Sequence, residues 1–313
     1  MNQHPKRYKK QLINLLKCAI VAAAFYFIYD QVRLSKAVEW NRLLAVMSQH
    51  SVVFIVFILS LSVWNRYFEI LKWQNLVQSF QPLSVGRAAA QVFGALTAGI
   101  FTPNGFGEYA GKAFFFEKSK AKKIIFLNLL CNGIQMVITV VFGVIGLVYF
   151  NAAFGVFEAK TVLLLAGCFV VLLSLLFSIK KITLKGYSID FFIRKVTEIP
   201  ARIHRKNALL GMGRYLVFSH QYYFLFLFFG VNLPYFALMS VITSSYFLSS
   251  SLPSFQFLDF AVKGSVALFF CGLLGINSWI PLLITAIMWV LNVVIPVGIG
   301  SYFVLNFKPT SSL

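Results

Sequence analysis

The chain has 313 residues, of which 59% are hydrophobic and 12% are charged, and its mean hydropathy is +0.80. So few polar side chains cannot cover the surface of an ordinary water-soluble domain, which excludes that class. The formal net charge of +19 raises nucleic acid as a partner. No nucleic-acid-binding motif accompanies the basic residues, however, so we expect no such partner.

Apolar stretches along the chain predict several membrane spans, because a helix that crosses a bilayer needs about 20 mainly apolar residues. Such stretches lie at 12–29, 51–71, 124–150, 161–179, 215–231 and 279–304. Two more apolar regions, 84–118 and 235–274, contain proline-bearing breaks that would stop a helix part-way across. We therefore predict an all-α, polytopic protein with six full spans and two re-entrant helical hairpins, in a single membrane domain over residues 1–313.

The basic residues predict the orientation, because positive charge favours cytoplasmic loops. With the N-terminus inside, the cytoplasmic side would hold Lys6, Arg7, Lys9, Lys10, Arg66, Lys72, Arg87, Lys118, Lys120, Lys122, Lys123, the bases from Lys180 to Arg214, and Lys308. This pattern places both termini in the cytoplasm. We expect the spans to lie in the cell membrane, that is, the bacterial cytoplasmic membrane. It also requires each hairpin to enter and leave by one face.

The longest polar segment, 180–214, is a basic cytoplasmic linker between the halves. Its apolar residues Ile189, Phe192 and Val196 have helical spacing, and Pro200 would end that helix. The segment is either an amphipathic helix on the inner leaflet, with anionic lipids as partners, or a solvated linker.

An inverted repeat is indicated by the two interrupted regions, which share an order of proline, acid, aromatic, alanine and lysine. The recurring residues are Pro103, Glu108, Tyr109, Ala110 and Lys112 in the first region and Pro253, Asp259, Phe260, Ala261 and Lys263 in the second. Three full crossings in residues 1–150 would invert the second repeat, 151–313. Inverted repeats with broken helices are an architecture of secondary transporters.

Both breaks offer features of an anion site. Asn104 and Ser254 are plausible helix N-caps, and the N–H groups that follow them would attract a phosphate. The acid–lysine pairs stand at i and i+4, so they either bind the ligand or merely neutralise each other at depth. The predicted substrate-binding residues are Pro103, Asn104, Gly105, Gly107, Glu108, Lys112, Pro253, Ser254, Asp259 and Lys263. No catalytic set, metal site or cofactor is expected.

Two further groups of residues concern the spans themselves. Asn128, Asn132 and Gln135 fall on roughly one helix face, where they would line a cavity or bond between helices. Pro296, four residues after Asn292, predicts a kink in the last span.

The first break also carries a family resemblance. It reads Thr102-Pro103-Asn104-Gly105-Phe106-Gly107-Glu108-Tyr109-Ala110-Gly111-Lys112. This resembles the flippase-like transmembrane family that forms the membrane portion of bacterial lysylphosphatidylglycerol synthases, which carries Pro-x-Gly-x-Gly-Glu followed by a small residue and a base. Pro253 corresponds to the second break of that layout. The resemblance implies a polytopic module that moves modified phospholipids or isoprenoid-linked molecules between leaflets.

We expect a lipid transporter rather than an enzyme, with a membrane lipid of anionic headgroup as its substrate. The soluble aminoacyl-transferring domain of the synthases is absent from these residues, so lysyl transfer is not expected from this chain alone. Two alternatives stay open. One is an intramembrane lipid-modifying transferase that uses Glu108 as general base, and the other is a non-catalytic membrane partner protein.

Overall fold

The computed structural model describes residues 51–100, 102, 105–156, 158, 160, 189–252 and 259–307, together with positions 15, 22 and 26. Throughout these residues the regular secondary structure is helical, which confirms the all-α part of the predicted fold. Three helices are long and apolar enough to cross a membrane: Val52–Val77, Lys118–Phe154 and Trp279–Leu305. They match three predicted spans, and they agree with a membrane protein. The spans predicted at 12–29 and 161–179 lie outside the described residues.

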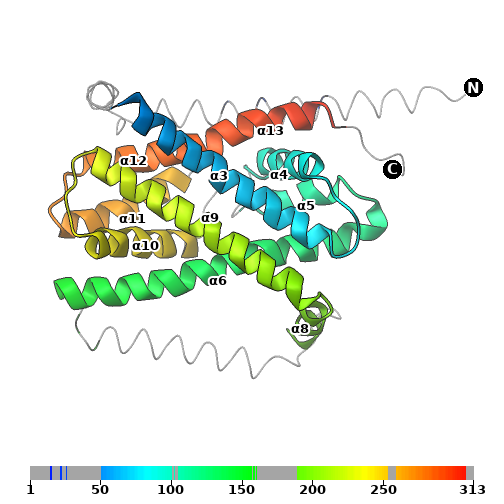
Figure 1. Ribbon diagram of the computed structural model, residues 1–313, viewed down its shortest axis with the longest axis horizontal. Helices are drawn as coiled ribbons and strands as arrows, with labels where there is room; N and C mark the ends of the chain where they lie inside the picture. Colours follow the sequence, from blue (N-terminus) through cyan, green and yellow to red (C-terminus); the bar gives the residue numbers. More distant parts are fainter. Residues whose placement is uncertain are drawn as a thin grey trace, which may run out of the picture.

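Two long helices run side by side through the molecule (Figure 1). Helix α3, Val52–Val77, starts at Ser51, whose hydroxyl accepts the N–H of Val53. It packs along α9, Ala201–Phe228, where the rings of Phe54 and Phe228 stack with centroids 5.3 Å apart. Helix α9 contains the predicted span 215–231 almost whole but begins at residue 201, inside the predicted linker. Residues 201–214 of the segment predicted as a linker are therefore the start of a long helix.

A short helix precedes α9. Helix α8, Ile189–Thr197, is the one that the spacing of apolar residues predicts, and it ends before Pro200. The ring of Phe192 packs edge-on against Phe126, with centroids 5.4 Å apart. Part of the apolar face of α8 thus contacts the protein itself.

The first interrupted region folds into two helices that lie against each other, α4, Val85–Gly99, and α5, Gly107–Ala113. Gly105 has φ 69°, a left-handed conformation that glycine adopts without strain. A Cβ added to Gly111 would lie 2.9 Å from the Cα of Ala95, and one added to Gly107 would lie 2.9 Å from the carbonyl oxygen of Ala98. The glycines of this motif therefore serve a tight reversal and a close helix contact.

The second interrupted region also gives two helices in contact, α10, Tyr235–Ser251, and α11, Asp259–Leu273. Helix α10 packs on α6, Ala121–Phe154, which follows the short 3-10 turn Lys118–Lys120. The contact is close because Gly146 has no side chain, and a Cβ there would meet the Thr243 hydroxyl.

The last membrane helix consists of α12, Trp279–Trp289, a π-helical turn, Val290–Val294, and α13, Ile295–Leu305. The irregular turn lies directly before Pro296, where the sequence predicts a kink. Pro296 has no N–H with which to bond the carbonyl of Asn292 four residues earlier, and π-turns are typical of such interruptions. Helix α13 packs on α4, where Thr97 donates to the carbonyl of Val297 at 3.1 Å.

Helix contacts in the first half have counterparts in the second. Helices α3 and α9 contact each other. Helix α4 contacts α13, and its counterpart α10 contacts α6. Helix α5 contacts α6, and its counterpart α11 contacts α12. In Figure 1 the α4–α5 pair lies at one end of the bundle and the α10–α11 pair at the other. The first helix of each pair thus packs on the long helix of the other half.

Candidate functional site

A cavity of about 490 Å³ lies between the two helix pairs. Its wall takes residues from α3, α4, α5, α6, α9, α10, α11 and the π-turn. Gly105 and Glu108 border it from the first interrupted region, and Ser249, Leu252 and Asp259 border it from the second. Described residues beside both breaks, which are about 150 residues apart in the sequence, thus face one space.

Of the ten predicted site residues, four line this cavity: Gly105, Glu108, Asp259 and Lys263. Pro103, Asn104, Pro253 and Ser254 lie outside the described residues. The residue at the cap position of α5 is Phe106, two residues after Asn104, and it makes no side-chain cap bond. The hydroxyl of Thr102 instead accepts the N–H of Gly107 at 2.7 Å.

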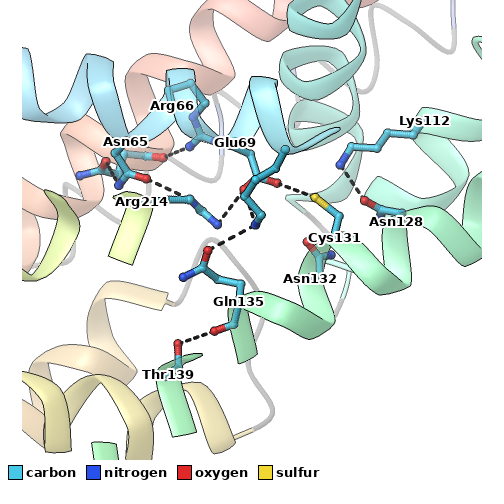
Figure 2. A network of polar contacts seen from close by, with 12 residues as sticks. Asn65, Arg66, Glu69, Lys112, Asn128, Cys131, Asn132, Gln135, Thr139 and Arg214 are labelled. Carbon is cyan, nitrogen blue, oxygen red and sulfur yellow. Dashed lines mark hydrogen bonds and ion pairs between the residues drawn. The ribbon is translucent and has the colours of Figure 1, made fainter. Parts of the chain in front are cut away.

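Lys112 occupies a different place from the one that its spacing to Glu108 suggests. Its ammonium donates to the amide oxygen of Asn128 at 2.6 Å (Figure 2). It also lies 4.6 Å from the centre of the Trp73 ring. The side chain is 1% exposed and does not border the cavity, whereas Glu108 does. The structure therefore supports a packing role for Lys112 more directly than ligand binding.

Asp259 and Lys263 form the i,i+4 ion pair that the sequence predicts, with Nζ and Oδ2 2.5 Å apart. The Lys263 ammonium also lies 5.3 Å from the centre of the Tyr246 ring and 5.7 Å from that of Phe218. An ammonium over aromatic faces is held electrostatically. This lysine is thus fixed at the cavity wall by its own helix and by α9 and α10.

The strongest charge cluster in the described part of the chain centres on Glu69 of α3 (Figure 2). One carboxylate oxygen is 2.8 Å from Arg214 Nη1 and 3.3 Å from Lys72 Nζ, and the Cys131 thiol donates to the other at 3.7 Å. Lys72 also donates to Gln135 at 3.3 Å. Lys72 is fully buried, and the Glu69 side chain is 7% exposed, so the carboxylate compensates two cations in a largely buried place beside the cavity.

Amide side chains extend this cluster across α3, α9 and the π-turn. Asn65 accepts from Arg214 at 3.0 Å and donates to Asn292 at 2.9 Å. Asn292 in turn donates to Gln221 at 3.3 Å. The backbone carbonyl of Asn292, which Pro296 cannot bond, accepts from Arg66 at 2.6 Å. The helix irregularity thus supplies an acceptor for a charged residue of the neighbouring helix.

The amides of α6 divide between the two interpretations that the sequence left open. Asn132 and Gln135 line the cavity, and Asn132 donates to Tyr109 at 3.3 Å. Asn128 is fully buried and bonds Lys112 between helices. Both roles therefore occur on one helix face.

The central cluster was missed at the level of sequence. Arg66, Lys72 and Arg214 were counted only as bases of the cytoplasmic side, and the structure places all three within helices. There Lys72 is buried and Arg214 pairs with Glu69. The available signal was the spacing of Arg66, Glu69 and Lys72, three residues apart on one face of an apolar helix.

Comparison with known proteins adds no relative: no protein-family model matches the chain, and no curated protein matches its sequence. The resemblance of the segment from Thr102 to Lys112 to the synthase membrane family therefore stays a prediction that rests on that motif.

Proposed function

We propose that the protein is a lipid transporter that moves a phosphate-bearing lipid between membrane leaflets through the central cavity. The observation that supports this most is a charged cavity that residues of both interrupted regions border. Irregular backbone at membrane depth is tolerated where it lines a cavity, and transporters place their substrate sites between broken helices of two repeats. The α4–α5 and α10–α11 pairs are then re-entrant hairpins.

Apolar surface outside the cavity supports a lipid environment. On α6 the exposed residues Val137, Val141, Val144 and Val148 follow one another at three- and four-residue spacing, which places them on one face. Helix α3 likewise exposes Val56 and other apolar residues. A polar cavity inside and apolar side chains outside are the reverse of a soluble protein.

The paired contacts of the two halves support the inverted repeat. In that arrangement the interrupted helices approach from opposite faces, and the site lies near the midplane. The basic loops then place both termini in the cytoplasm, as the sequence predicts. The family resemblance points to the same class of substrate.

The test is leaflet exchange of a headgroup-labelled phospholipid in vesicles that contain only this protein, followed by mass analysis of the lipid. Ser250 and its neighbour Ser251 are both exposed, but Ser250 borders the cavity and Ser251 does not. We expect Ser250→Trp to slow exchange at least tenfold and Ser251→Trp to leave it unchanged. Exchange no faster than in protein-free vesicles contradicts the proposal. A covalently changed lipid favours an intramembrane transferase, with Glu108 at the cavity wall as its base.

A further inference from the structure

Arg66 differs from the other cations around the cavity in its partner. Lys72 and Arg214 contact Glu69, and Lys263 contacts Asp259. Arg66 borders the cavity, and its hydrogen bond within the described residues goes to a neutral acceptor, the carbonyl of Asn292. No carboxylate of the described chain lies within 4.0 Å of its guanidinium.

The remaining charges favour a ligand of negative sign. The wall carries three bases, Arg66, Arg214 and Lys263, and three acids, Glu69, Glu108 and Asp259. Lys72 lies behind Glu69 and bonds it, so four bases against three acids leave one positive charge. A cation without a carboxylate partner is costly at membrane depth, and an anionic ligand removes that cost.

The cavity wall also carries hydrogen-bond donors that the described contacts leave unused. A guanidinium has five N–H groups, and the described contacts of Arg66 use one. The Tyr109 hydroxyl accepts from Asn132, which leaves its own proton for another acceptor. The Tyr215 hydroxyl is buried without a hydrogen-bond partner in the described structure, although Tyr215 borders the cavity. These donors are available to a ligand that carries acceptor oxygens.

We propose that Arg66 anchors a phosphate-binding site in the cavity wall, with the hydroxyls of Tyr109 and Tyr215 as further donors. Planar guanidinium groups match phosphate oxygens in pairs, and a cavity of about 490 Å³ has room for such a group. The carbonyl of Asn292 holds the guanidinium in place in the empty site. The site takes either free phosphate or the phosphate of a lipid head. Only the lipid case rests on the proposed function.

The test measures binding of inorganic phosphate to the detergent-purified full chain by thermal stabilisation, at constant ionic strength set with chloride. We expect saturable stabilisation of the wild type. Arg66→Gln weakens phosphate affinity at least about tenfold, since one charge-assisted hydrogen bond is lost. Arg66→Lys keeps the charge and retains intermediate affinity. Arg205→Gln, on the exposed face of α9, serves as the matched control and leaves affinity unchanged.

Each variant is compared with its own melting temperature without phosphate, so a general loss of stability does not imitate a loss of binding. Water-soluble dihexanoyl phosphatidic acid is then added as competitor. Competition shows that the site accepts a lipid head. If phosphate binding depends on Arg66 but dihexanoyl phosphatidic acid does not compete with phosphate, the result supports the phosphate site and contradicts the lipid transporter. If the protein exchanges lipid between leaflets but Arg66→Gln does not change its phosphate affinity, the result contradicts the Arg66 site. The proposed transport function is then unaffected.

Discussion

Replacing Glu69 with glutamine removes the one carboxylate that contacts two cations at the centre of the molecule. Glutamine keeps the shape of the side chain, so the change isolates the charge. Lys72 is fully buried and would keep only Gln135 and a neutral amide as contacts, while Arg214, with its side chain 24% exposed, retains some water. Breaking a buried pair by removing one partner costs about 3–5 kcal/mol. Because Arg214 is partly solvated, we expect Glu69→Gln to lower the free energy of unfolding by about 3 kcal/mol, the lower end of this range.

The assay is unfolding of the purified protein by sodium dodecyl sulfate in mixed micelles, followed by helical circular dichroism. The matched control is Glu198→Gln, since Glu198 also pairs with a lysine three residues away, Lys195, at 2.7 Å. The Glu198 side chain is 59% exposed, so its pair contributes less than about 1 kcal/mol. Adding Lys72→Met to Glu69→Gln removes the stranded cation and is expected to recover roughly half of the loss. Equal effects of the two glutamine variants refute the reasoning.

The packing of the helices gives two further predictions. Gly111→Ala places a Cβ 2.9 Å from the Cα of Ala95 and is expected to destabilise the protein by about 1–3 kcal/mol, measured by the same unfolding assay. The control is Gly133→Ala, where no atom lies within 4 Å of the added Cβ, and it is expected to stabilise the protein by up to about 1 kcal/mol. If Gly111→Ala and Gly133→Ala both destabilise the protein, the result counts against the close contact of α4 and α5. Gln91→Leu leaves the buried Trp73 indole N–H, now 2.7 Å from the Gln91 oxygen, without its acceptor. We expect the free energy of unfolding to fall by about 1–3 kcal/mol and the tryptophan emission to change. Neither change would appear if the hydrogen bond contributed nothing.

The helical class and three of the spans could be predicted from the sequence because lipid imposes long apolar stretches. The two interrupted regions were also found, since proline and glycine change backbone geometry locally and visibly. Gly105 is an example, with its left-handed backbone at the break of the first motif. These features depend on near neighbours in the chain.

The central charge cluster depends on partners distant in the chain, and the sequence does not reveal such pairs. Arg214 meets Glu69 across 145 residues, and Arg66 finds the Asn292 carbonyl only because the last helix is irregular there. Basic residues were placed by the rule that positive charge favours cytoplasmic loops. That rule does not identify a base whose charge is compensated by an acid within the helices. The bond of Lys112 to Asn128 could not be predicted for the same reason, because it depends on how α5 lies against α6.

Photo-crosslinking tests most directly whether a lipid phosphate enters the cavity. A phospholipid with a photoactivatable group beside its phosphate is incorporated into vesicles with the full chain, irradiated, and the adducts are mapped by peptide mass analysis. The account predicts adducts on cavity residues, in the peptides that contain Arg66 and Gln135. Adducts confined to the outer surface of α6, at residues such as Val141 and Val144, would contradict it.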